Sequence, residues 1–66
     1  MNEEELKVRR DETKHNLDKL ESLIYEQLKE RTVDDEVFWM MTRLEDAMSK
    51  YWYELSMLID VLEKQK

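Results

Sequence analysis

The chain of 66 residues contains neither glycine nor proline, and this double absence limits its possible folds more than any other feature. Glycine supplies the positive-φ conformations of tight turns, and proline fixes the backbone at many other turn positions. A β fold needs such turns between successive strands, so a chain without either residue is expected to be helical. The sequence therefore predicts an all-α protein with few chain reversals.

A single domain over residues 1–66 is also too small to stabilise itself easily. Such a domain buries only about 60% of the surface that its unfolded chain exposes. Cysteine is absent, which excludes disulfides and thiolate metal sites, and the single histidine, His15, excludes a histidine-rich site. We therefore expect no metal and no cofactor, and we expect a partner subunit to supply the missing stability.

The charge of the chain argues against two classes of partner. Charged residues make up 42% of the sequence, and the net charge is −6, which opposes binding to nucleic acid or to anionic lipid. The N-terminus, residues 1–5, is acidic and is not followed by the apolar run of a signal peptide. No segment is long and apolar enough to cross a bilayer. We expect a cytoplasmic protein that binds neither nucleic acid nor membrane.

The first helix is predicted over residues about 3–30. Asn2 followed by Glu5 has the spacing of a capping box, and Glu3 to Glu5 place negative charge in the first turn, where the helix dipole favours it. The apolar positions of this segment recur at helical spacing. They are Leu6, Leu17, Leu20, Leu23, Ile24 and Leu28.

A turn is predicted over residues about 31–34, followed by a second helix over residues about 35–64. Asp34 alone, or Thr32 together with Asp35, can cap the second helix. A connection this short makes the two helices antiparallel neighbours. The fold expected from these segments is a coiled-coil-like helical hairpin.

The second helix carries the clearest periodicity of the chain. Apolar residues follow a 4-3-4-3-4-3-4 spacing, which is typical of a coiled-coil seam. This seam comprises Val37, Met41, Leu44, Met48, Tyr51, Leu55, Leu58 and Leu62. Phe38, Trp52 and Ile59 widen it on one side, and Met40, Ala47 and Val61 widen it on the other. The second helix therefore has an unusually wide apolar face.

The first helix does not match this face. In a hairpin, the second half of the 35–64 helix lies against residues 6–16, where Arg10 and Thr13 occupy the seam. Part of the apolar face is thus left uncovered. Soluble monomers rarely expose a continuous apolar patch of several hundred Å². Either two copies form a four-helix bundle or another protein covers the face. We favour the homodimer because it requires no further component.

A second set of residues on the 35–64 helix lies opposite the seam. Trp39 and Tyr53 are two heptads apart, and Arg43 and Met57 fall on the same line. Trp, Tyr, Arg and Met are enriched in protein interfaces, so we predict partner binding there. A slight rotation of the helix, or burial of these residues by a second copy, is the alternative explanation.

Independent chemistry is not expected. Ser22, Ser49 and Ser56 have no base nearby in the sequence, and no glycine-rich loop can hold phosphate. Acidic pairs such as Asp34 and Asp35 are explained as helix caps. The sequence therefore predicts a protein that is not an enzyme and has no catalytic residues of its own.

Part of the second helix resembles the short sporulation-regulatory phosphatases, which remove phosphate from an aspartate of a response regulator. Residues 34–37 read Asp-Asp-Glu-Val, residues 41–45 read Met-Thr-Arg-Leu-Glu, and Tyr51 follows. The family has an Asp-Pro-Glu-Val-like segment, a Ser-Gln-Glu-Leu-Asp signature and a tyrosine at the same spacing. The resemblance implies a cytoplasmic helical hairpin. Of the signature, only Leu44 is unchanged, although Glu45 keeps the carboxylate.

Four functions remain open, and a non-catalytic regulator or inhibitor that binds through its helix faces is favoured. The altered signature implies such binding without dephosphorylation. A response-regulator phosphatase is the second possibility, in which Glu45 acts and Thr42 helps to place water. The third is a hairpin co-chaperone or adaptor, similar to those of bacterial secretion systems, in which a different subunit covers the apolar face. An acidic inhibitor of a nucleic-acid-binding protein has only the net charge in its favour.

Overall fold

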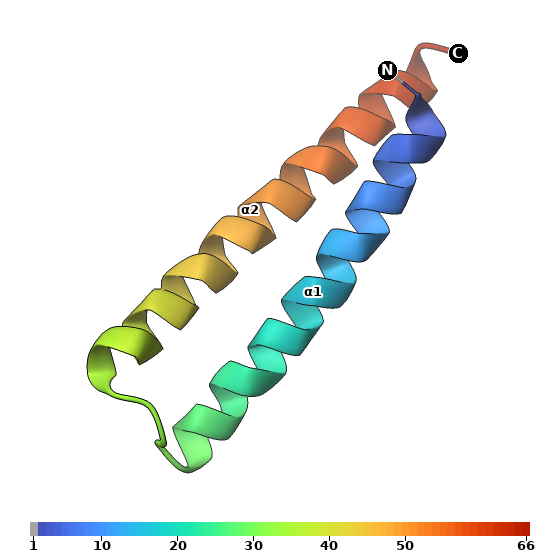
Figure 1. The fold of residues 1–66 in the computed structure, drawn as a ribbon. Helices are drawn as coiled ribbons and strands as arrows, with labels where there is room; N and C mark the ends of the chain where they lie inside the picture. The colour runs from blue at the N-terminus through green and yellow to red at the C-terminus, as the bar shows by residue number, and fades with distance from the viewer. Residues whose placement is uncertain (1) are drawn as a thin grey trace.

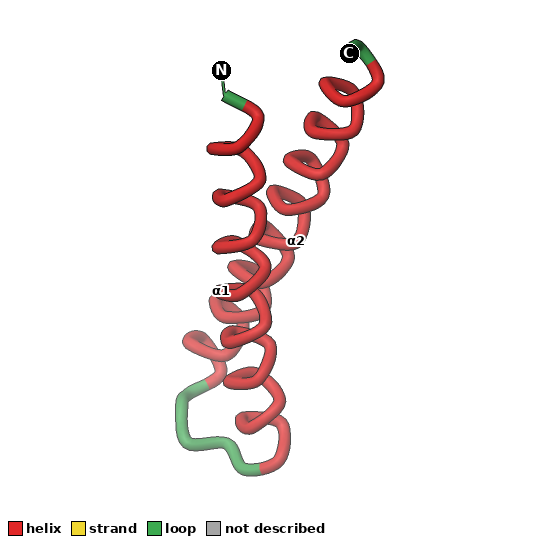
Figure 2. Tube along the Cα trace, turned by 90° about the vertical axis from the view of Figure 1, so that its right-hand side faces the viewer, coloured by secondary structure: helices red, strands yellow, loops and turns green. Residues whose placement is uncertain are grey.

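A computed structural model describes residues 2–66, and in this range the chain forms two α-helices and no strand. Helix α1 spans Glu3–Lys29 and helix α2 spans Asp35–Lys64. The chain reverses once, so both of its ends lie at one end of a rod measuring 49 × 16 × 15 Å (Figure 1). Seen at a right angle, the helices cross (Figure 2). The predicted all-α helical hairpin is confirmed.

Both helices begin at a side-chain cap. Asn2 Oδ1 accepts a hydrogen bond from the Glu4 amide at 2.8 Å, and Asp34 Oδ1 accepts one from the Val37 amide at 2.9 Å. These caps satisfy amides that have no partner within the helix. Of the two caps proposed for the second helix, Asp34 is the one that forms.

The turn is held by a residue that the periodicity does not single out. Gln27 Oε1 accepts hydrogen bonds from the amides of Thr32 and Val33, at 2.8 and 3.1 Å, and its Nε2 donates to the Thr32 hydroxyl at 2.8 Å. The amide side chain thereby pairs with backbone groups that the helices leave free. This explains how residues 30–34 reverse the chain without glycine or proline.

Arg31 fastens the turn to the start of α2. Its guanidinium lies 3.9 Å from the ring centre of Phe38 and 2.7 Å from a carboxylate oxygen of Asp35. The first contact is a cation–π interaction, and it covers the buried Phe38 ring with a charged group that also contacts water.

The buried core is small. Leu6, Leu55 and Ile59 form one cluster near the chain ends, with Leu62 packed against it, and Leu17 and Phe38 are buried further along the rod. Leu62 is half-buried, and the other five are the buried hydrophobic residues of the described chain. Within residues 2–66, neither helix has the length and apolarity needed to cross a membrane. The cluster fixes the open end of the hairpin, and the Gln27 bonds fix the other end.

Candidate functional site

Helix α2 presents three lines of side chains, and the first, which we call the inner seam, faces α1. Its members are buried or half-buried and follow a 3-4-3-4-3-4-3 spacing. The inner seam comprises Phe38, Met41, Glu45, Met48, Trp52, Leu55, Ile59 and Leu62. Helix α1 meets it with residues of the same spacing, among them Leu6, Arg10, Thr13 and Leu17, all buried or half-buried. Arg10 and Thr13 thus occupy the seam positions expected for them.

The second line, which we call the lateral stripe, runs one residue before each position of the inner seam. It comprises Val37, Met40, Leu44, Ala47, Tyr51, Glu54, Leu58 and Val61, all of them exposed. Its six large apolar side chains are between 39% and 57% exposed. The single wide seam predicted from the sequence is therefore divided: Phe38, Trp52 and Ile59 turn towards α1, whereas Val37, Leu44, Tyr51 and Leu58 do not.

The third line, the outer stripe, comprises Trp39, Arg43, Asp46, Lys50, Tyr53, Met57 and Asp60, and all seven are exposed. Trp39 is 63% exposed and Tyr53 is 57% exposed. The Trp39 ring stands edge-on to Phe38, with 5.9 Å between ring centres. A buried ring thus supports the exposed indole of Trp39 on one side.

The two residues that the phosphatase resemblance singles out lie together. Thr42 and Glu45 line one shallow pocket between the helices, opposite Tyr25 and Leu28 of α1. The Thr42 hydroxyl donates to the Trp39 carbonyl at 2.8 Å, and Glu45 accepts from the Ser49 hydroxyl at 3.2 Å. Tyr51 lines a different groove, so the structure does not bring it to this pocket.

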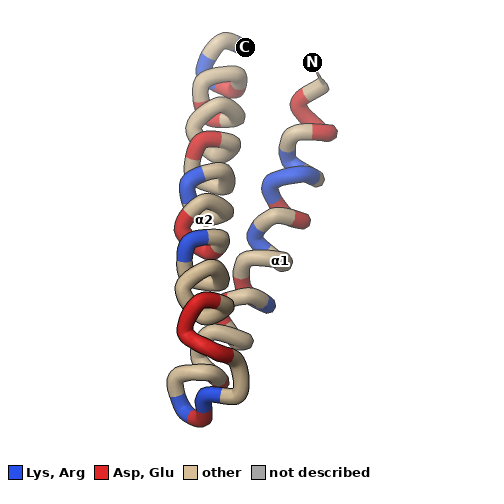
Figure 3. The backbone as a smooth tube through the Cα atoms, turned by 60° about the vertical axis from the view of Figure 1, so that its left-hand side comes forward, with Lys and Arg blue, Asp and Glu red and all other residues tan. Residues whose placement is uncertain are grey.

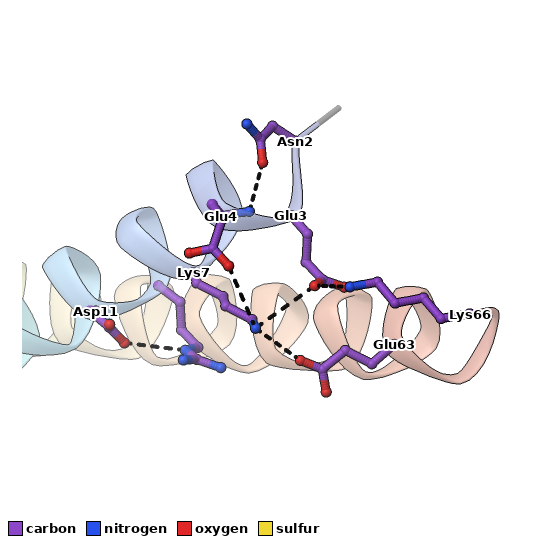
Figure 4. Close-up of polar contacts among 8 residues, drawn as sticks. Asn2, Glu3, Glu4, Lys7, Asp11, Glu63 and Lys66 are labelled. Carbon is purple, nitrogen blue, oxygen red and sulfur yellow. Dashed lines mark hydrogen bonds and ion pairs between the residues drawn. The ribbon is translucent and has the colours of Figure 1, made fainter.

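An ionic cluster closes the open end of the hairpin (Figure 4). A single oxygen of Glu3 lies 2.6 Å from Lys66 Nζ and 3.8 Å from Lys7 Nζ, and Lys7 Nζ is 3.2 Å from Glu63. The hydrogen bond from Lys66 is the main cause that lowers the pKa of Glu3. The hydrogen bond to Glu63 is the main cause that raises the pKa of Lys7. The cluster joins the first turn of α1 to the last turn of α2.

Sequence reasoning did not find this cluster, nor the role of Gln27. The only signal was the acidic first turn of α1, which we explained by the helix dipole. The cation–π contact of Lys14 with Trp52, 5.3 Å from Nζ to the ring centre, was not predicted either. The contacts of Lys66 with Glu3, Lys7 with Glu63 and Lys14 with Trp52 join residues that are distant in the sequence, and the Gln27 bonds cross the turn, so helical periodicity gives no sign of them.

The charged residues of the described chain lie mainly in local ion pairs. Lys, Arg, Asp and Glu alternate along the first half of α1 (Figure 3). Most of the ion pairs join residues within a few positions of each other, such as Lys14 with Asp18 and Lys50 with Asp46. Among residues 2–66, no group of three or more His, Asp or Glu side chains is placed to hold a metal ion.

Comparison with known proteins adds no assignment, because no family model, no curated protein and no solved structure matches the chain. The resemblance to the sporulation phosphatases therefore rests on residues 34–37, residues 41–45 and Tyr51 alone. The lateral and outer stripes of α2 carry nine of the exposed large apolar side chains of the described chain. They are the candidate functional surfaces.

Proposed function

We propose that this protein is a non-catalytic cytoplasmic regulator or inhibitor that binds another protein through the outer stripe of α2. The single observation that carries the proposal is the exposure of Trp39 and Tyr53, with Arg43 and Met57, on one line of a rigid helix. Large aromatic side chains lose little conformational entropy on binding and contribute much apolar area. Helix-in-groove recognition fits such a line of anchors.

A homodimer is the expected platform for this binding, as a four-helix bundle in which Trp39 and Tyr53 stay accessible. Five buried hydrophobic side chains are few for a stable domain, and more than twice as many large apolar side chains are exposed. A second copy that covers the lateral stripe adds apolar burial while Trp39 and Tyr53 still face solvent.

Site-specific photo-crosslinking tests the proposed surface. Benzoylphenylalanine is placed at Trp39 or at Tyr53, and at Tyr25 as the matched control, because Tyr25 is an equally exposed aromatic residue on α1. We expect adducts to a distinct protein from positions 39 and 53 that excess parent protein competes away. Equal adducts from position 25, or none from positions 39 and 53, would contradict the proposal.

The affinity for the protein identified in this way then measures how much Trp39 and Tyr53 contribute to binding. We expect the double substitution Trp39→Ala and Tyr53→Ala to weaken binding by at least about 30-fold, the effect of losing a hot spot of about 2 kcal/mol. Tyr25→Ala is the control and should leave the affinity unchanged. Circular dichroism of each variant verifies that the hairpin is still folded.

A response-regulator phosphatase is the second candidate, supported by the pocket that Thr42 and Glu45 share. In this function Glu45 positions a water molecule for attack on an aspartyl phosphate, and Thr42 helps to hold that water. Phosphate release from a phosphorylated receiver domain tests it, with Glu45→Gln as the variant. If the parent chain releases no phosphate above the spontaneous rate, this candidate is eliminated.

A further inference from the structure

We infer that the lateral stripe of α2 is covered by the lateral stripe of a second copy of this chain, with the two α2 helices antiparallel about a two-fold axis. This inference deepens the homodimer of the proposed function by naming its interface and its orientation. It starts from the spacing of the stripe. Positions 37, 40, 44, 47, 51, 54, 58 and 61 are the two apolar positions of four successive heptads, and α1 covers none of them.

The exposed area of the hairpin agrees with one missing partner. The accessible surface is 5361 Å². A folded monomer of 8.2 kDa is expected to expose about 4,500 Å². The excess is roughly 800 Å², which is about the area that each partner buries in a standard stable interface.

The stripe is complementary to itself when the two helices run in opposite directions. With the axis midway between Ala47 and Tyr51, each Ala47 lies opposite Tyr51 of the second copy, so a small side chain meets a large one. The same register places Met40 opposite Leu58, and Val37 opposite Val61. The central pair thus matches a small side chain with a large one, as close packing between helices requires, and the outer pairs are apolar on both sides.

The one charged residue of the stripe decides the orientation. A parallel pair places Glu54 against Glu54 of the second copy inside the seam, and like charges in close contact there are destabilising. An antiparallel pair places Glu54 opposite Leu44 and beside Arg43. Among the described residues, the ion pairs of the single hairpin include neither Arg43 nor Glu54.

The two ends of α2 also favour the antiparallel arrangement. Glu36 at the start of the helix and Lys64 at its end occupy equivalent flanking positions, and the same register places them opposite each other. An apolar pocket lined by Val37, Met40, Met41 and Leu44 lies near the turn, and a groove lined by Leu6, Tyr51, Leu55 and Leu58 lies near the chain ends. Only antiparallel pairing brings the pocket of one copy to the groove of the other.

Light scattering across a hundredfold concentration range measures the assembly. We expect twice the 8.2 kDa chain mass for the parent protein. Leu44→Glu should return the mass to that of one chain with unchanged helicity, because its new carboxylate lies opposite Glu54 of the second copy. Leu28→Glu is the matched control, since Leu28 is at least as exposed as Leu44 but lies on α1, and it should stay dimeric.

Thiol crosslinking measures the orientation, because the parent chain contains no cysteine. Val37→Cys and Val61→Cys are prepared separately and then mixed in equal amounts with a short bis-maleimide. We expect covalent dimers in the mixture and at most a tenth of that yield from either variant alone. Strong crosslinking of Val37→Cys by itself would show parallel pairing and overturn the inference.

A parent chain that stays at 8.2 kDa over the whole range also overturns the inference. The lateral stripe would then await a different subunit, as in the co-chaperone alternative. The proposed function is judged separately by the adducts from Trp39 and Tyr53. These can be present when the dimer is absent, and absent when the dimer forms.

Discussion

The inner seam and the lateral stripe of α2 have the same spacing and lie one residue apart, yet only the residues of the inner seam are buried or half-buried. The inner seam contains Phe38, Trp52 and Ile59, and the equivalent positions of the lateral stripe are Val37, Tyr51 and Leu58. Burying the bulky Phe38 and Trp52 removes more apolar surface from water than burying Val37 and Tyr51, whose hydroxyl group also needs a partner. A single helix such as α1 cannot cover both the inner seam and the lateral stripe. The comparison shows that a heptad pattern indicates a seam without indicating which partner covers it.

Each line also contains one glutamate, and the structure treats the two differently. Glu45 of the inner seam is half-buried and accepts a hydrogen bond from Ser49, whereas Glu54 of the lateral stripe is exposed. A buried carboxylate needs such a partner, and an exposed one is satisfied by water. Substitution of each glutamate can therefore measure the inner seam and the lateral stripe separately.

The largest expected effect is that of Ile59→Ala in the inner seam, set against Leu58→Ala in the lateral stripe. Ile59 is 1% exposed, so its truncation leaves a cavity and should lower the free energy of unfolding by about 2–5 kcal/mol. Leu58→Ala should change the stability of the single hairpin by about 0.5 kcal/mol or less. Urea unfolding in the Leu44→Glu background excludes any contribution from self-association. Equal losses would mean that the two lines share one core.

Replacing each glutamate by leucine sharpens the comparison. Glu54→Leu makes the lateral stripe fully apolar and should tighten self-association by about 1.5–3 kcal/mol per chain, the value of burying one leucine. Glu45→Leu should raise the unfolding temperature of the hairpin with no effect on the dimer dissociation constant. Sedimentation and thermal unfolding of both variants measure the two quantities. A tighter dimer from Glu45→Leu would contradict the division between the lines.

Gln27→Leu tests how much the turn contributes to the stability of the hairpin. Two amides, those of Thr32 and Val33, lose their acceptor, and the hairpin should be destabilised by about 1 kcal/mol. Gln27→Glu is the control, since it keeps oxygens that accept from the two amides and loses only the Nε2 donor to the Thr32 hydroxyl. Thermal unfolding should show the larger decrease for leucine. An equal decrease for both would assign the effect to the hydroxyl contact.

The smallest expected effect concerns the ionic cluster at the open end. Because the pKa of Glu3 is lowered on folding, the stability that it contributes is complete above the usual glutamate pKa and is lost as the pH falls through the lowered value. Because the pKa of Lys7 is raised, its contribution is lost as the pH rises above the usual lysine range. Glu3→Gln should flatten the acidic part of the stability curve. An unchanged curve would show that other carboxylates cause the acid sensitivity.

Much of the fold could be predicted because its causes are local. Three features of the sequence indicate the fold, and each concerns residues within one or two helical turns of one another. They are the absence of glycine and proline, the cap at Asp34 and the apolar spacing of residues 37–62. The exposed positions of Trp39 and Tyr53 follow from the same helical period, although their role in binding stays a prediction. The roles of Gln27 and Lys66 could not be predicted, since they depend on contacts that form only after the chain reverses.

The sequence by itself determined two helices, their caps and a wide apolar face on the second one. The tertiary structure decided how that face is divided between Trp52 on the inside and Tyr51 on the outside. The physical reason is that apolar side chains at a given spacing favour burial against any suitable surface, while the rotation of a helix depends on which neighbour it meets. In this hairpin the Gln27 bonds and the Leu6 cluster fix that neighbour at both ends.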